Sequence, residues 1–267
     1  MQATPRIDRL TVAGLALLLM PVLTMLHEIG GHAAMCLAVG SKVTGLGAFY
    51  VSCAAETGGD WARRAVAFAG PGIDVVAAML GYLAWKRARS DLPRLVLWYV
   101  WLCCGFSAAG YLAYSGVTGI GDLGPGKGGG IGPLPMAGLW RAGLAVIGGF
   151  AYWQLIRAGK VSLDAMIGQG LPTKPARRAA SHLFYIVLCA AAIGASLLNP
   201  VGLFITLASA AAASFGGKSG LISIGFATRP DGEPRPFAIG RSVPVLVVGA
   251  IASILFAVVL GPTITPG

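Results

Sequence analysis

Residues 27–32 read His-Glu-Ile-Gly-Gly-His, inside an apolar run that extends from about Leu10 to Val39. Two imidazoles and a carboxylate are costly to place in a membrane helix, and ionisable side chains at that depth usually face a polar cavity, a partner or a bound ion. The stretch is therefore the first candidate for a functional site. It also indicates the fold class, because an apolar run of this length crosses a bilayer as a helix.

The composition of the whole chain agrees with a membrane protein. Of its 267 residues, 56% are hydrophobic and 11% are charged, whereas a soluble domain carries about 25% charged residues. The first apolar run continues through Leu26 into the histidines, without the polar mature start that follows a signal-peptide cleavage site. We therefore expect an uncleaved first helix.

We expect an all-α polytopic membrane protein with six or seven transmembrane helices and small strand or hairpin elements between the spans. Several of the expected spans reach the roughly 20 apolar residues that cross a bilayer. Asn199-Pro200 divides the fifth span from the sixth, because proline disfavours helix at the residue before it. The sixth is short, so a re-entrant segment is the alternative there. The expected spans are 10–39, 65–86, 93–116, 137–157, 180–198, 200–215 and 242–260.

Two stretches between spans have the sequence of short strands. Residues 41–54 contain Lys-Val-Thr and Phe-Tyr-Val, which are broken by glycines. Residues 220–228 and 236–241 flank Arg-Pro-Asp-Gly-Glu-Pro at 229–234, a sequence typical of a turn. We therefore expect a strand insertion at 41–54 and a short hairpin at about 220–241.

The formal net charge is +10, and we interpret the basic residues as topology signals, with no nucleic-acid partner. If the N-terminus is cytoplasmic, fifteen Lys and Arg residues fall in inner segments and five in outer ones, the bias of a positive-inside protein. We therefore expect a multi-pass protein of the bacterial cytoplasmic (inner) membrane with a cytoplasmic N-terminus. The inner set is Arg6, Arg9, Lys86, Arg87, Arg89, Arg94, Arg157, Lys160, Lys174, Arg177, Arg178, Lys218, Arg229, Arg235 and Arg241, and the outer set is Lys42, Arg63, Arg64, Lys127 and Arg141.

The five cysteines are Cys36, Cys53, Cys103, Cys104 and Cys189. Four of them lie in apolar spans, and the sequence has no Cys-x-x-Cys pair and no Cys/His cluster. We expect them to be small buried hydrophobic residues, with neither a disulfide framework nor a cysteine zinc site.

The spacing of the two histidines decides how the first helix can hold a metal ion. In His-Glu-x-x-His, histidines four apart share one helix face and bind one zinc, while the glutamate acts as general base. Here they are five apart, about 140° around a regular helix. Three outcomes are open. A π-bulge at Gly30-Gly31 restores a shared face, Glu28 and His32 are the ligands with His27 behind them, or the metal site is lost.

A catalytic zinc site typically has three protein ligands and a water molecule, so one ligand must come from another part of the chain. The candidates are Asp122, Asp74 and His182. Asp122 follows the third span in a glycine-rich stretch, 116–135, for which we predict irregular backbone. The alternatives are a loop or capping role for Asp122, a hydrogen bond between helices for Asp74, and a solvated interfacial position for His182. The histidine pair favours Asp122 as the third ligand.

The chain resembles the intramembrane zinc metalloproteases of the site-2 protease type, and more closely their small bacterial relatives. The matching features are Leu-His-Glu-Ile-Gly-Gly-His-Ala at 26–33 and Val-Gly-Ser-Lys-Val at 39–43, which leads into a strand. Ala-Gly-Pro-Gly-Ile-Asp at 69–74 is similar to the family's Gly-Pro-x-x-Asn at the start of the next core helix, and Gly-Asp at 121–122 follows a further helix. The resemblance covers about residues 10–125.

Carried over residue by residue, the resemblance implies that His27, His32 and Asp122 bind Zn²⁺ and that Glu28 is the general base. The sequence departs from the family pattern at three points. The first motif has one extra residue, Asp74 stands where the family has asparagine, and the family's Leu-Asp-Gly is Gly-Asp-Leu here.

The resemblance also implies a fold and an activity. Residues 1–125 would form a catalytic-like three-helix core with a strand insertion at about 41–54, and residues 126–267 would add transmembrane helices. The substrate would be a single-span membrane protein, cleaved within or near the lipid bilayer, with the strand at 41–54 pairing with its unwound segment. With the N-terminus in the cytoplasm, the site would lie towards the outer face, whereas the family usually opens towards the cytosol.

Two other functions use the same buried residues. A metal-free pseudo-protease that binds membrane clients without cleavage is favoured by the unusual histidine spacing. A transporter of protons or metal ions would need acidic residues along several spans and an inverted repeat, and the sequence shows neither.

Overall fold

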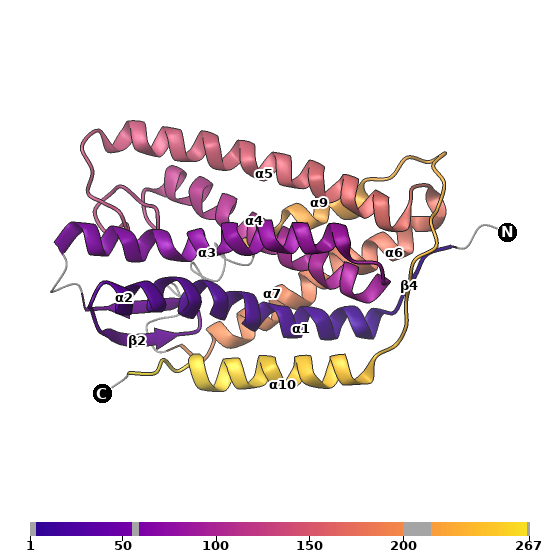
Figure 1. Ribbon diagram of the computed structural model, residues 1–267, viewed down its shortest axis with the longest axis horizontal. Helices are drawn as coiled ribbons and strands as arrows, with labels where there is room; N and C mark the ends of the chain where they lie inside the picture. Colours follow the sequence, from indigo (N-terminus) through magenta and orange to yellow (C-terminus); the bar gives the residue numbers. More distant parts are fainter. Residues whose placement is uncertain (1–3, 55–58, 200–214, 266–267) are drawn as a thin grey trace.

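The computed structural model describes residues 4–54, 59–199 and 215–265, and these residues are mostly helical (Figure 1). The expected span 200–215 lies outside the described residues, apart from its last residue. In chain order the elements are β1 (Arg6–Ile7), α1 (Arg9–Met25), η1 (Leu26–Ala33), α2 (Ala34–Ala38), β2 (Val43–Gly47), β3 (Tyr50–Cys53), α3 (Gly59–Arg87), α4 (Asp91–Thr118), α5 (Ala137–Ile167), η2 (Leu171–Thr173), α6 (Lys174–Arg178), η3 (Ala179–Leu183), α7 (Phe184–Ser196), α9 (Gly220–Phe226), β4 (Ala238–Ile239) and α10 (Val243–Leu260).

Five helical segments in the described part of the chain are long and apolar enough to cross a membrane. The helix expected at 137–157 is present as α5 but is not one of them, because Arg141, Gln154 and several glycines lower the hydropathy of its most apolar stretch. The structure is therefore that of a helical, membrane-embedded protein. The five segments are Arg9–Ala38, Gly59–Arg87, Asp91–Thr118, Leu171–Ser196 and Val243–Leu260.

The α4 helix is the centre of the bundle. It packs against both α3 and α5, and Trp98, Tyr99, Leu102 and Phe106 on it are fully buried. The indole N–H of Trp98 donates to Ser162 Oγ at 2.8 Å. This hydrogen bond satisfies the one polar atom of the side chain, as an apolar membrane interior requires. Most of the large apolar side chains that remain exposed lie on α3, α5 and α10, the faces that meet lipid in such a protein.

The first helix begins at a capped end. Asp8 Oδ1 accepts from the backbone N–H of Thr11 at 3.0 Å, which satisfies one of the amides that a helix N-terminus leaves unpaired. This backbone hydrogen bond lowers the pKa of the Asp8 carboxyl. Beside it, β1 pairs in parallel with β4, with Arg6 opposite Ala238. The pairing brings α10 alongside α1, as Figure 1 shows.

The hairpin expected at about 220–241 is not formed. Residues Gly220–Phe226 are helix α9, which packs on α5, and the only regular strand that follows, β4, pairs with β1 instead of folding back. The turn-like sequence at 229–234 does not join two strands, because the apolar residues of α9, such as Leu221 and Ile224, lie three apart and are buried on one side of a short helix. The strand insertion at 41–54 is confirmed, as β2 and β3 pair in antiparallel fashion.

The expectation that no cysteine forms a disulfide is wrong. Cys36 on α2 and Cys53 on β3 are bonded, with their Cα atoms 6.0 Å apart. The β2–β3 hairpin folds back over the end of the first helix and brings together two cysteines that are 17 residues apart. Cys103, Cys104 and Cys189 form no disulfide and are buried, as expected for small apolar residues.

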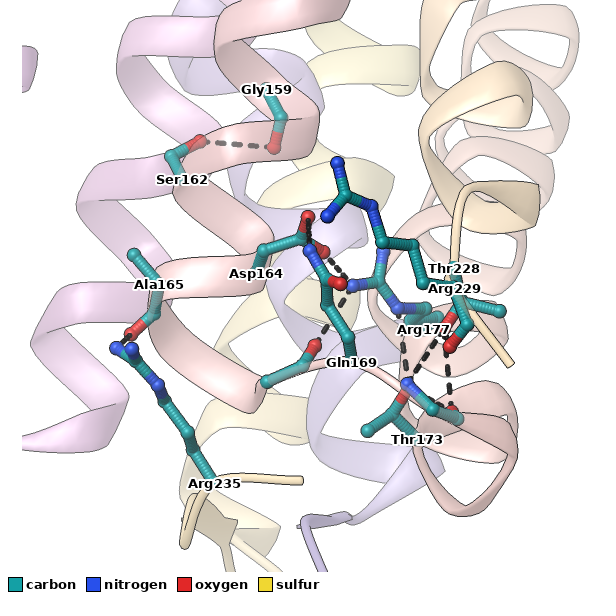
Figure 2. A network of polar contacts seen from close by, with 12 residues as sticks. Gly159, Ser162, Asp164, Ala165, Gln169, Thr173, Arg177, Thr228, Arg229 and Arg235 are labelled. Atoms are coloured by element: carbon teal, nitrogen blue, oxygen red, sulfur yellow. Dashed lines mark hydrogen bonds and ion pairs between the residues drawn. The ribbon is translucent and has the colours of Figure 1, made fainter. Parts of the chain in front are cut away.

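At the end of the bundle away from the β2–β3 hairpin, a polar network joins α5, η2 and α6 (Figure 2). Arg177 is fully buried, and its guanidinium donates to the carboxylate of Asp164, to the carbonyl of Gly168 and to Thr173 Oγ1. Gln169 Nε2 also donates to Asp164, at 2.8 Å. Arg177, which the sequence placed among the basic residues of the inner segments, is therefore paired with Asp164 on α5.

The packing of α1 on α10 depends on two glycines. A Cβ at Gly249 would overlap the carbonyl oxygen of Gly14, whereas a Cβ at Gly149 on α5 would meet nothing within 4 Å. We expect Gly249→Ala to lower the free energy of unfolding by about 1–3 kcal/mol through overpacking, measured by unfolding in detergent or lipid. The matched control Gly149→Ala should be neutral or slightly stabilising. Equal effects of the two variants would contradict this packing.

Candidate metal centre

The first helix widens at its two histidines. Residues Leu26–Ala33 form a π-helix, η1, between α1 and α2. In a π-helix the hydrogen bonds join residues five apart, so His27 and His32 come to lie one above the other on the same face. Of the three outcomes left open by the sequence, the structure has the local geometry of the first.

The widened turn packs directly on α3. A Cβ at Gly31 would lie 2.6 Å from the Cα of Gly70, so the two backbones touch. A Cβ at Gly70 would overlap Nε2 of His32 and lie 2.7 Å from Nε2 of His27. Both positions therefore require glycine, because the imidazoles lean over the backbone of α3. Gly70 lies in the middle of α3, not at the start of a core helix as the family pattern predicts.

Three potential ligand atoms converge above Gly70. His27 Nε2 is 3.2 Å from His32 Nε2, and Asp122 Oδ2 lies 3.3 Å from the first and 3.4 Å from the second. Zinc bonds of about 2.0–2.1 Å at tetrahedral angles place ligand atoms about 3.3–3.4 Å apart. The three atoms thus form one face of a tetrahedron of the size that zinc requires, and the residues fit the ion.

The other nitrogen of each imidazole is fixed by an acceptor. His27 Nδ1 donates to Asp74 Oδ2 at 2.8 Å, and His32 Nδ1 donates to the carbonyl of Val66 at 2.7 Å. In the neutral imidazoles the two Nε2 atoms then carry lone pairs. Two such lone pairs and the Asp122 carboxylate all accept, so a proton or a metal cation must lie among them. Orientation of this kind is usual for histidines that bind metal.

Asp122 is placed by the glycine-rich loop after α4, whose irregular backbone is confirmed. Gly119 and Gly121 have φ angles of 79° and 83°, and Gly130 N donates to the carbonyl of Gly121 at 2.9 Å. Burial would raise the pKa of the Asp122 carboxyl, but its hydrogen bonds with His27 and His32 outweigh burial and hold that pKa well below its usual value. The carboxyl is therefore ionised and able to bind a cation.

Glu28 lies beside this cluster and not within it. Its side chain is 4% exposed, and Oε2 has no hydrogen-bond partner among the residues that the structure describes. The group of possible ligands in the described residues consists of His27, His32 and Asp122. This arrangement leaves a buried carboxylate oxygen next to the place where a metal ion would sit, as the general base of a hydrolase requires.

The other candidate ligands have different places. Asp74 is 2% exposed and accepts a hydrogen bond from His27 Nδ1. It therefore orients a possible ligand and is not itself in the group of possible ligands. His182 is not part of the cluster, and its Nε2 bonds the carbonyl of Ile222 at 3.0 Å. The ring of Tyr111 stacks on His27 at 4.8 Å. Nothing in the sequence pointed to Tyr111, which is one aromatic residue among many in an apolar span.

No known family, no curated protein and no solved structure matched this chain in the comparisons. The site is therefore interpreted from its own geometry.

We expect Gly70→Ala to abolish metal binding, because the added methyl group occupies the space of the two Nε2 atoms. The control is Gly72→Ala in the same helix, where a Cβ would meet nothing within 4 Å. Zinc per chain, measured by elemental analysis after reconstitution, should be close to zero for the first variant and unchanged for the second. Full zinc binding by Gly70→Ala would exclude this cluster as the metal centre.

Proposed function

We propose that the chain is an integral membrane zinc metalloprotease of the site-2 protease type, which cleaves peptide bonds of single-span membrane proteins within or near the bilayer. The observation that carries the proposal is the convergence of His27, His32 and Asp122 at zinc-ligand spacing beside the buried Glu28. A centre that only stabilised the fold would not need a carboxylate oxygen held without a partner in an apolar span.

Each residue has a defined task in this proposal. His27, His32 and Asp122 hold the ion, and Asp74 keeps the Nδ1 proton on His27. When bound, zinc supplies Lewis acidity towards the substrate carbonyl and makes water a nucleophile at neutral pH. Glu28 accepts a proton from the attacking water and transfers it to the amine as the peptide C–N bond breaks.

The β2–β3 hairpin is the element suited to hold an extended substrate. Strand addition supplies main-chain hydrogen bonds to an unwound segment. The outer edge of β2 is already occupied, because Leu46 and Ile264 exchange backbone hydrogen bonds of 2.8 and 2.9 Å. We therefore assign the substrate to β3, which also lies closer to η1 than β2 does.

The proposed location is the bacterial cytoplasmic membrane, with the N-terminus in the cytoplasm. The metal centre and the β2–β3 hairpin then lie towards the outer face, at the end of the bundle opposite β1 and β4 (Figure 1). The Cys36–Cys53 disulfide supports this orientation, because disulfides persist in the periplasm and are rare in the cytosol.

The alternative function is a metal-free pseudo-protease that binds membrane clients without cleavage. The histidine spacing favoured it, since a regular helix would separate the imidazoles. The π-helix removes that objection, so the protease is the better supported of the two.

Metal analysis with two variants separates these functions. We expect about one zinc per chain in the wild type and in Glu28→Gln, and little in Asp122→Ala, which loses a ligand. Cleavage of a single-span test substrate should fall about 10²–10⁴-fold in Glu28→Gln, because the general base is removed. Wild-type protein that takes up no zinc after reconstitution would exclude the protease and leave the pseudo-protease.

Cysteine accessibility tests the orientation. Thr44 on β2 and Asp231 in the segment between α9 and β4 are both exposed. Figure 1 shows these two segments near opposite ends of the bundle. In intact cells, a membrane-impermeant thiol reagent should label Thr44→Cys and not Asp231→Cys. The native cysteines outside the disulfide are buried and should add no background. Labelling of Asp231→Cys alone would reverse the topology.

A further inference from the structure

Lys218 is buried in the core of the bundle, although the sequence placed it with the inner-loop charges. Lys218 is 7% exposed, and its Nζ donates to Ser107 Oγ on α4 at 3.1 Å. A charged group in such a position marks a functional site by default. The mechanism proposed above gives Lys218 no role.

The backbone around Lys218 is anchored by the surrounding helices. Tyr185 on α7 donates to the carbonyl of Phe215 at 2.9 Å, and the hydroxyl of Tyr152 on α5 accepts from Gly220 N at 2.7 Å. On α4, a Cβ at Gly110 would lie 3.2 Å from the Cα of Gly217. Segment 215–220 is therefore held by α7 and α5 and lies close against α4, which brings the ammonium to Ser107.

Lys218 and Glu28 line the same small cavity. Its volume is about 20 Å³, and its polar lining also includes His27, Ser107, Tyr111 and Thr24, with leucine side chains and Met20 around them. A cavity needs roughly 10–15 Å³ of such volume to hold one water molecule, which also needs two to four polar partners. The cavity meets both requirements.

We propose that this cavity binds one water molecule, held by Lys218 and Ser107 and directed at the carboxylate of Glu28. An ammonium donates hydrogen bonds, an ionised carboxylate accepts them, and water does both, so one water molecule can bridge the two groups across the cavity that they share. Water in this place accepts from Lys218 and donates to Glu28 Oε2, the buried oxygen that has no partner among the described residues.

The role of this water rests on the proposed function. Its protons point at the general base, so the cavity stores the reactant that a hydrolase inside an apolar bundle must obtain. Lys218 is then a positioning residue, which acts on the reaction through the water. Because Lys218 lies beyond residues 10–125, the second half of the chain also contributes a residue to the site.

Hydroxyl-radical footprinting tests the water directly, because radicals formed from bound water oxidise the side chains next to it. Met20 lines the cavity, and Met166, which does not, is equally buried, each being 2% exposed. We expect oxidation of Met20 and protection of Met166 in the wild type. In Lys218→Met, oxidation of Met20 should fall to the level of Met166. If that variant does not fold, Ser107→Ala replaces it and should give the same loss.

Kinetics test the positioning role. Lys218→Met should lower kcat roughly tenfold to hundredfold, with KM and zinc content unchanged, and Lys218→Arg should recover part of the loss. The exposed Lys174→Met is the matched control and should leave kcat unchanged.

The outcomes separate this inference from the function on which it rests. Protection of Met20 in the wild type, or oxidation unaffected by Lys218→Met and Ser107→Ala, would overturn the water site whether or not the protein is a protease. Oxidised Met20 in a protein that binds no zinc would support the water site and overturn its role in hydrolysis. A loss of zinc in Lys218→Met would assign Lys218 to the fold of the metal centre and overturn the positioning role.

Discussion

The contact on which the site depends is the one between two backbones, where the π-turn of the first helix meets α3 at Gly31 and Gly70. Side chains at either position would push the helices apart. Because they are absent, the imidazoles of His27 and His32 extend over the backbone of α3 and reach Asp122. The widened helix and the close helix pair are thus a single structural feature, and each would be costly without the other.

Each of the two imidazoles is held by a partner on another element. His27 is held by Asp74 on α3 and His32 by a carbonyl of the same helix, while the carboxylate that meets them comes from the loop after α4. In an apolar environment an unsatisfied polar group costs several kcal/mol. Glu28 Oε2 stands out for that reason, and both the proposed catalytic role and the proposed water site address the same atom.

Much of the architecture could be predicted from local sequence. Apolar length gave the helices, glycine-broken β-prone runs gave the hairpin at 41–54, and the glycine-rich stretch gave irregular backbone around Asp122. The predictions failed where short segments depend on distant neighbours. Cys36 meets Cys53 only because the hairpin folds back over α2, and residues 220–226 are helical because they are buried against α5.

The sequence by itself determined that the chain belongs in a membrane and that His27, Glu28 and His32 are its most unusual residues, because charge and apolar length are local properties. It left open whether five-residue spacing could serve a metal ion. Tertiary structure brings the two imidazoles to one face of the helix, since a π-turn forms where two glycines allow close packing on α3. Tertiary structure alone placed Lys218 in the core, because three other helices hold the segment that carries it.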